Sequence, residues 1–263
     1  MMRVIKTIIL TAILLQTVSF AQIMEVIFSG RIDTFYLNSV DSITFKTSAS
    51  PLTDIDGNVY KTVKIGNQRW MAENLKVTHY RDGTAAIPNV TDGTAWGLLA
   101  TGAYCIYNNN AGNEVDTYGT LYNWYAVTDS RNLAPEGWHV PTDDDWKELE
   151  MYLGMSQSEA DNTGLRGTNE GSKLAGNADL WYSSGNLENN SEFGTSGFTA
   201  LPGGYRDYSN GSYYVMGYRG YFWSATEGNS SYAWYRLLNY LYSDVDLYGD
   251  SKRSGFAVRL LRD

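Results

Sequence analysis

Tyrosine, asparagine, serine and aspartate dominate one stretch of this 263-residue sequence, where they make up 14 of the 23 residues at 229–251. Tyrosine offers a rigid ring for contact and the short polar side chains offer adaptable hydrogen bonds, a mixture typical of binding surfaces. It also suits sugars, whose ring faces stack on aromatic side chains and whose hydroxyls bond polar atoms. The candidate ligand-binding residues are Tyr232, Trp234, Asn239, Tyr240, Tyr242, Asp244, Asp246 and Tyr248.

These side chains need strands that hold them on one surface. Between residues 240 and 248, polar or aromatic residues alternate with mostly apolar ones, which predicts a strand with one wet, aromatic-rich side. The alternative is a solvated sheet surface that has no partner. Further strands are expected at 222–226, 232–238 and 255–261. Four tyrosines could flank the surface: Tyr205, Tyr208, Tyr213 and Tyr214.

Turn residues mark two hairpins at the start of the main domain, which we expect to begin near residue 53. Asp56-Gly57 and Gly66-Asn67 each separate two β-type runs, and glycine supplies the positive φ that tight hairpin turns need. These pairs predict antiparallel strands on either side of each turn.

Two short helices are expected between the strands. Thr142 precedes Asp145 by three residues, as in a capping box, and Gly154 is a natural terminator for the helix that follows. Apolar residues at helical spacing predict a second helix at 118–128. The sequence therefore predicts an α+β domain with two short helices, antiparallel strands and long loops.

The first 21 residues have the pattern of a secretory signal peptide. A basic start is followed by an apolar stretch and by Ser19-Phe20-Ala21, which places small residues at a cleavage site after Ala21. The apolar stretch is too short for the ~20 residues of a membrane-spanning helix. We expect a secreted or cell-surface protein, with a short β-rich segment at 22–52 (runs at 25–28, 31–36 and 41–45) before the main domain.

Composition excludes several kinds of function. The formal net charge of −9 argues against nucleic-acid binding, which needs clustered Lys and Arg. Two His and one Cys cannot form a Cys/His zinc site, an iron–sulfur cluster or a disulfide framework. We expect Cys105 to be a buried small apolar residue. No cofactor is expected, and the spacing does not support a structural calcium site.

Aspartates at two places could be interpreted as calcium ligands, but they have simpler explanations. Asp54 and Asp56 superficially resemble a calcium loop, yet the later Glu and the full ligand spacing are missing, so a hairpin turn is favoured. The run at 143–145 fits the first turn of a helix, where carboxylates complement the helix dipole. His139 is expected to be a hydrogen-bonded structural residue. Four tryptophans are expected in the core: Trp70, Trp124, Trp138 and Trp223.

Motifs along residues 53–263 resemble the Fibrobacter major paralogous domain. They are DIDGNVYKTVKIG at 54–66, WMAENL at 70–75, GAYC at 102–105, YGTLYNWYAV at 118–127, APEGWHVPT at 134–142, LPGG at 201–204, FWSAT at 222–226 and GFAVR at 255–259. The resemblance implies a C-type-lectin-like fold, of the branch shared with formylglycine-generating enzymes, and no established catalytic activity. Family members often have a Cys near Leu260 that could pair with Cys105, and it is absent here.

The leading interpretation is an exported, non-enzymatic surface protein that binds a glycan or a protein partner through residues 232–248. Related lectin-like proteins carry diversified C-terminal regions rich in the same residue types, so this tract could be variable. A formylglycine-generating activity needs two thiols, and only Cys105 is present. Two alternatives stay open, namely a secreted polysaccharide-acting hydrolase with unidentified carboxylates and a purely structural surface protein.

Overall fold

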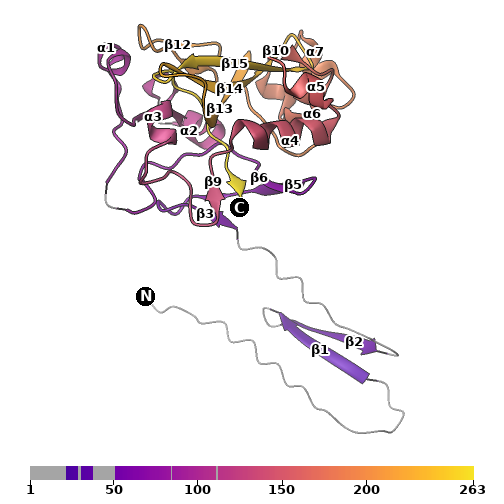
Figure 1. Cartoon of the computed structure of the whole chain (residues 1–263). Helices are drawn as coiled ribbons and strands as arrows, with labels where there is room; N and C mark the ends of the chain where they lie inside the picture. Colours follow the sequence, from indigo (N-terminus) through magenta and orange to yellow (C-terminus); the bar gives the residue numbers. More distant parts are fainter. Residues whose placement is uncertain (1–21, 29–30, 38–50, 84, 111) are drawn as a thin grey trace. The chain divides into compact units, whose positions relative to one another are not determined.

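The chain divides into two compact units, residues 1–50 and Pro51–Asp263. The computed structural model describes residues 22–28, 31–37, 51–83, 85–110 and 112–263 (Figure 1). In the first unit, β1 (Gln22–Phe28) and β2 (Arg31–Leu37) form an antiparallel pair. The two expected runs at 25–28 and 31–36 are therefore strands, whereas the run at 41–45 and the signal segment at 1–21 lie outside the described residues.

The second unit is an α+β domain built around two four-stranded sheets. The larger sheet has the strand order β10-β15-β14-β13, with all three neighbouring pairs antiparallel. The second sheet has the order β5-β6-β16-β9. The strands of these sheets are β5 (Thr62–Ile65), β6 (Gln68–Met71), β9 (Trp138–His139), β10 (Gly164–Arg166), β13 (Arg219–Glu227), β14 (Tyr232–Asn239), β15 (Val245–Ser251) and β16 (Leu261–Arg262).

Three two-stranded pairs complete the strands of this unit. Both expected hairpins are confirmed, because the turn at residues 55–57 joins β3 to β4 and the turn at 66–67 joins β5 to β6. The paired strands are β3 (Leu52–Thr53) with β4 (Val59–Tyr60), β7 (Tyr104–Cys105) with β8 (Leu121–Tyr122), and β11 (Tyr205–Arg206) with β12 (Tyr213–Tyr214).

Helices are more numerous than the two expected from the sequence. The described residues contain seven α-helices, all but one of them six residues or shorter. Figure 1 shows α4 to α7 gathered beside one end of the larger sheet. The helices are α1 (Gly93–Gly97), α2 (Asn113–Tyr118), α3 (Trp124–Val127), α4 (Asp143–Leu153), α5 (Gln157–Ala160), α6 (Glu170–Leu174) and α7 (Asn186–Asn189), with 3-10 turns η1 (Tyr107–Asn109) and η2 (Ala178–Leu180).

The expected helix beginning after Thr142 is confirmed as α4. Thr142 and Asp145 form the complete capping box, and Gly154 follows the last helical residue. Three side chains on one side of α4 are buried, namely Trp146, Leu149 and Glu150. This buried side packs α4 against the larger sheet.

The expected helix at 118–128 is wrong, because two features interrupt it. Gly119 has φ +72, and a Cβ there would lie 2.7 Å from the carbonyl oxygen of Leu75, so α2 ends at Tyr118. Leu121 then pairs with Cys105 in a sheet, and only Trp124–Val127 is helical. Tertiary pairing overrides the helical spacing of the apolar residues.

The expected strand at 240–248 is also wrong in its first half. The N–H of Tyr242 donates to the carbonyl oxygen of Asn239 at 3.0 Å, which closes a turn, and β15 begins only at Val245. The Asn239 side chain also accepts a hydrogen bond from the backbone of Leu241, a local bond that favours a turn. The alternation of residue types therefore spans a turn and a strand.

Residues 255–262 thread between several elements instead of forming the single strand expected at 255–261. Gly255, Phe256 and Ala257 make isolated bridges to Arg206, Tyr122 and Phe222. Leu261 pairs with Trp70 on one side and with His139 on the other. One short segment thus joins both four-stranded sheets and two of the two-stranded pairs, β7–β8 and β11–β12.

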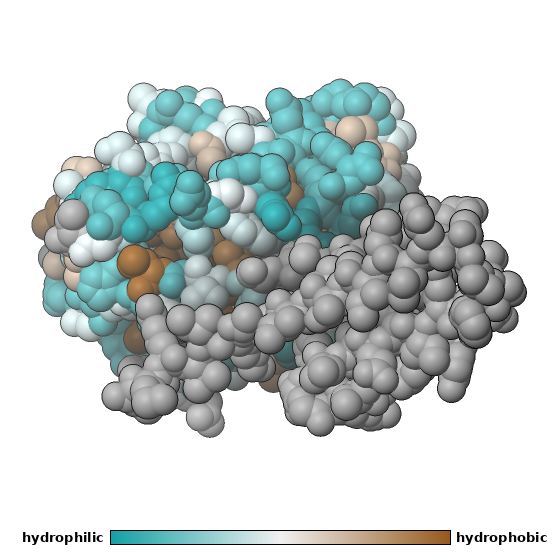
Figure 2. All heavy atoms as spheres, turned by 90° about the horizontal axis from the view of Figure 1, so that it is seen from below, coloured by the Kyte–Doolittle hydropathy of each residue, from teal (hydrophilic) through white to brown (hydrophobic). Residues whose placement is uncertain are grey.

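Aromatic side chains dominate the core. Trp70 and Trp146 lie 4.9 Å apart between ring centroids, and Trp223 and Phe256 lie 4.3 Å apart. Three of the four expected core tryptophans are buried, and Trp138 is half-buried against the same core. Outside the core, the described residues in the view of Figure 2 are mostly hydrophilic, with small separate apolar groups. Within the described ranges, every helix is too short or too polar to span a lipid bilayer.

Candidate functional site

The eight residues singled out from the sequence do not share one face of the sheet. Side chains alternate along a strand, so Tyr232 and Trp234 lie on the side of Arg236, which contacts α4. Tyr248 is the cross-strand partner of Tyr235 and lies on the opposite side. Tyr240, Tyr242 and Asp244 belong to the turn between β14 and β15.

Burial separates these residues further. Tyr232, Tyr242 and Tyr248 are exposed, at 44%, 43% and 43%. Asn239 and Asp246 are each only 6% exposed, because neighbouring strands and the turn cover them, so their assignment to an open binding face is corrected. The remaining three, Trp234, Tyr240 and Asp244, are half-buried.

Tyr240 belongs to a cluster of three tyrosines that we call the tyrosine triad: Tyr182, Tyr218 and Tyr240. The rings of Tyr182 and Tyr218 are stacked, with centroids 4.9 Å apart and planes 25° apart. Tyr240 meets both rings edge-on at 5.3 Å. Tyr182 is 48% and Tyr218 40% exposed, so the triad presents a wide aromatic surface to solvent whose geometry is fixed by ring contacts.

Backbone hydrogen bonds place the triad. The N–H of Tyr240 donates to the carbonyl oxygen of Tyr218 at 3.0 Å, which continues the β13–β14 ladder by one residue pair. The N–H of Tyr182 donates to the carbonyl oxygen of Gly217 at 2.8 Å. Three segments far apart in the sequence therefore meet at one end of the larger sheet.

A charged group that we call the Asp246 cluster lies at the same end of the sheet: Arg219, Tyr221, Asp244 and Asp246. Arg219 and Asn239 are cross-strand partners, and Asp246 lies opposite Leu237 on the next strand. Burial and the charge of Asp244 raise the pKa of Asp246 to about 6, although Arg219 and Arg166 oppose the shift. Hydrogen bonding to Tyr221 raises the pKa of Arg219.

The four flanking tyrosines take part in local packing. Tyr205 and Tyr214 contact each other at 5.6 Å across the β11–β12 pair, and Tyr214 is exposed. Tyr213 donates to the Asn109 side chain at 2.8 Å and Tyr208 lies beneath the Arg253 guanidinium. None of these four contacts a ring of the tyrosine triad among the described residues, so they form a separate group.

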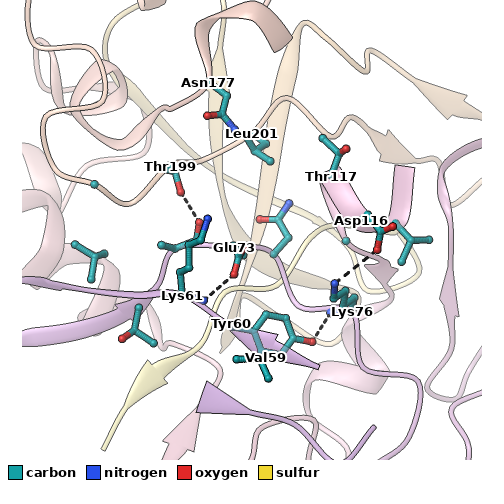
Figure 3. A pocket seen from close by; sticks show the side chains of 17 residues that line it. Val59, Tyr60, Lys61, Glu73, Lys76, Asp116, Thr117, Asn177, Thr199 and Leu201 are labelled. Carbon is teal, nitrogen blue, oxygen red and sulfur yellow. Dashed lines mark hydrogen bonds and ion pairs between the residues drawn. The ribbon is translucent and has the colours of Figure 1, made fainter. Parts of the chain in front are cut away.

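A cavity of about 600 Å³ lies away from the triad, beside β4 to β6 (Figure 3). In this view, Lys61 and Lys76 lie across from Asn177. The Glu73 carboxylate accepts a hydrogen bond from the backbone N–H of Lys61 at 2.7 Å, and Lys76 pairs with Asp116 at 3.8 Å. Its lining residues are Val59, Tyr60, Lys61, Thr62, Val63, Ala72, Glu73, Asn74, Lys76, Val115, Asp116, Thr117, Gly119, Asn177, Gly197, Thr199 and Leu201.

The aspartates that invited a calcium reading have protein partners. Asp54 accepts hydrogen bonds from Asn58 and from the Tyr60 hydroxyl, which fixes the first hairpin turn. Asp56 accepts from Thr78 and lies 2.6 Å from His79. In the described part of the chain, no group of three or more His, Cys, Asp or Glu side chains is placed to hold a metal.

Cys105 and His139, whose side chains could in principle take part in chemistry, have structural roles here. Cys105 is fully buried and free, as expected, and burial raises the pKa of its thiol to about 11. His139 is hydrogen-bonded as expected, with Nδ1 2.6 Å from Asp263 and Nε2 3.3 Å from Asp145. Hydrogen bonding to Asp145 is the main reason that the pKa of His139 is raised.

The chain belongs to the Fibrobacter succinogenes major domain family, whose model matches residues 63–262. The match covers both four-stranded sheets except Thr62, the tyrosine triad, and the cavity wall except residues 59–62. No curated protein and no solved structure matches the chain.

Proposed function

We propose that this protein is a non-enzymatic binding module that recognises glycans through the tyrosine triad. The main observation in support is the stacked, solvent-exposed pair of Tyr182 and Tyr218, whose rings Tyr240 contacts edge-on. Apolar faces of sugar rings pack on such aromatic surfaces, and the phenolic hydroxyls can bond to sugar hydroxyls. Because the rings already hold one another, little conformational entropy is lost when a ligand binds.

The wider assignment is a lectin-like or adhesin-like protein outside the cell. The predicted signal segment at residues 1–21 supports export, and the α+β architecture is compatible with the C-type-lectin-like fold that the motifs imply. A shallow aromatic surface gives modest affinity at a single site, so display of many copies would raise the overall affinity. A protein ligand at the same surface is the alternative partner.

The test is glycan-array binding of the purified chain, with and without a chelator, and with Tyr182→Ala and Tyr218→Ala variants. Each substitution should lower the affinity for the best array ligand about tenfold or more. Tyr152→Ala is the matched control, because Tyr152 is 65% exposed on α4 and outside the triad. Unchanged binding by both triad variants would overturn the proposal, and a blank array would favour a protein ligand or a structural role.

A polysaccharide hydrolase is the second candidate, and Asp246 is the observation that favours it. Its pKa of about 6 suits a general acid, with Asp244 as the neighbouring carboxylate, and because Asp246 is only 6% exposed the turn at 240–244 must move before a substrate reaches it. The test is release of reducing ends from labelled polysaccharides near pH 6. Turnover by the chain that Asp246→Asn abolishes would support this candidate, and no turnover on any polysaccharide that the chain binds would reject it.

A further inference from the structure

The cavity of Figure 3 is lined by two lysines and two carboxylates, and one of the lysines has no ion pair within the described chain. The backbone N–H of Lys61 bonds Glu73, but the ammonium group of Lys61 has no ion pair or hydrogen bond to any residue that the structure describes. Lys76 is paired only loosely with Asp116, whose side chain is 85% exposed. Lys61 is exposed and lines the cavity, so its ammonium group is open to an anionic ligand.

A second cation stands behind the cavity wall. Arg259 is fully buried and contacts no carboxylate. Its guanidinium donates to Asn74 Oδ1 at 2.6 Å and to the carbonyl oxygens of Phe198 and Thr199 at 2.7 and 2.8 Å. Asn74 and Thr199 also line the cavity, so the positive charge lies one residue layer behind it. The hydrogen-bond partners of Arg259 are neutral, and the charge that acts on it from the cavity is the Glu73 carboxylate.

The backbone of the cavity wall is strained at two residues. Asn177 and Thr199 both have φ +54, a left-handed conformation that is uncommon for asparagine and a marked outlier for β-branched threonine. The strain holds the Thr199 carbonyl on Arg259 and its hydroxyl on the carbonyl oxygen of Ala72. Strained residues of this kind persist where the surrounding structure maintains them, and they gather at binding sites.

The lining combines cations with groups that bond hydroxyls. The Thr117 hydroxyl and the Asn177 amide can donate and accept, and the Glu73 carboxylate can accept from a hydroxyl. A volume of about 600 Å³ falls in the usual range for small-molecule sites. A ligand that matches this lining carries a carboxylate and several hydroxyls.

We propose that this cavity binds an acidic sugar, a hexuronate unit whose carboxylate pairs with Lys61 and whose hydroxyls bond the threonine and amide side chains. The cavity is formed by β4, β5, residues 72–76, α2, Gly119, Asn177 and the 197–201 loop, none of which contributes a ring to the tyrosine triad. The site therefore does not depend on the function proposed for the triad, and each can fail while the other holds.

The experiment is isothermal titration of the purified full chain with digalacturonate, and with cellobiose as the neutral disaccharide. Digalacturonate should bind at least tenfold more tightly than cellobiose and more weakly at high salt. Lys61→Gln should weaken digalacturonate binding about 2- to 5-fold, the loss of one exposed ion pair. Lys64→Gln is the matched control, since Lys64 is exposed on β5, three residues from Lys61, and does not line the cavity.

Three results would overturn the proposal: no heat with digalacturonate at millimolar concentration, equal affinity for digalacturonate and cellobiose, or equal effects of the Lys61 and Lys64 variants. An N-acetylated tripeptide with a free carboxyl terminus tests whether any carboxylate suffices. Tighter binding of this peptide than of digalacturonate would reject the sugar assignment. Tyr182→Ala should leave digalacturonate binding unchanged, and far-ultraviolet circular dichroism confirms that each variant is folded.

Discussion

Glu150 on α4 and Arg236 on β14 form an ion pair that is entirely shielded from solvent, with Arg236 Nε 2.6 Å from Glu150 Oε1. Arg166 donates two hydrogen bonds of 2.9 Å to the same carboxylate. Arg236 also reaches Asp143 in the first turn of α4. This network fixes the helix to one side of the larger sheet, opposite the side that carries Asp246.

Glu150→Gln should lower the free energy of unfolding by about 3–5 kcal/mol, because it leaves buried Arg166 without a carboxylate and Arg236 with Asp143 alone. Urea unfolding followed by tryptophan fluorescence measures the change. Glu148→Gln, at an exposed position of α4, should change stability by less than about 0.5 kcal/mol. A loss below about 1 kcal/mol for Glu150→Gln would show that the network contributes little net stability.

Tyr240 and Tyr242 should behave differently although only two residues separate them. Tyr240 braces the triad and is half-buried against the core that includes Phe222 and Leu238, so Tyr240→Ala should weaken glycan binding and cost about 1–3 kcal/mol of stability. Tyr242 has no ring contact within the described chain, and Tyr242→Ala should leave stability within about 0.5 kcal/mol. Thermal unfolding and array binding of the two variants provide the comparison, and equal effects would contradict the triad geometry.

Asp246 makes stability depend on pH in a direction opposite to that of a paired carboxylate. Its pKa is about 6 in the folded protein and near 4 when unfolded, so the folded state retains a proton that the unfolded state releases between these pH values. Its contribution to stability is therefore full below pH 4 and falls as pH rises to about 6. Asp246→Asn should be more stable than the parent at pH 7 by roughly 1–3 kcal/mol, with the gap closing near pH 4.

The control for this pH effect is Asp116→Asn, at a side chain that is 85% exposed. Urea unfolding at pH 4, 5, 6 and 7 gives the difference in unfolding free energy between each variant and the parent. A gap for Asp246→Asn that does not vary with pH would mean that the carboxyl titrates normally in the folded state.

Gly185 leaves room for the turn that carries Tyr240. A Cβ at residue 185 would lie 1.7 Å from the carbonyl oxygen of Tyr240, so Gly185→Ala must displace the turn and should cost about 1–3 kcal/mol. Glycan binding should weaken in parallel because the triad loses its geometry. Gly249→Ala is the comparison, since its nearest neighbour would be an ordinary 3.7 Å away. If the two alanine variants melt at the same temperature, the prediction that residue 185 has no room for a Cβ beside the Tyr240 carbonyl oxygen is wrong.

Local signals in the sequence predicted the elements whose determinants are local. The hairpin turns at 55–57 and 66–67 and the helix that Thr142 begins have strong determinants in neighbouring residues. The interrupted helix at 118–128 and the turn at 240–244 depend on distant partners, such as Leu75 beneath Gly119, which no local pattern reveals. The short helices between residues 157 and 189 similarly lack the length that makes periodicity readable.

For the candidate site, the sequence located one contributor and missed its partners. Tyr240 was identified from the polar and aromatic tract, but Tyr182 and Tyr218 lie outside it and join it only through the fold. Residue type alone also could not distinguish exposed Tyr248 from buried Asp246, since both fit the same alternation. The sequence gives no signal for Lys61 of the cavity, because what marks this lysine is that its ammonium group has no partner among the described residues.

The threading of residues 255–262 between elements bears on how the domain folds. This segment touches strands or loops that begin some 190 residues earlier, near Trp70, and others near Tyr122, Arg206 and Phe222. During synthesis, those elements leave the ribosome before residues 255–262 do. They therefore lack the segment that connects them until residues 255–262 have emerged. Late closure of such long loops slows folding and leaves incomplete sheets exposed. We therefore expect the domain to assemble after synthesis of this segment, in a slow and cooperative final step.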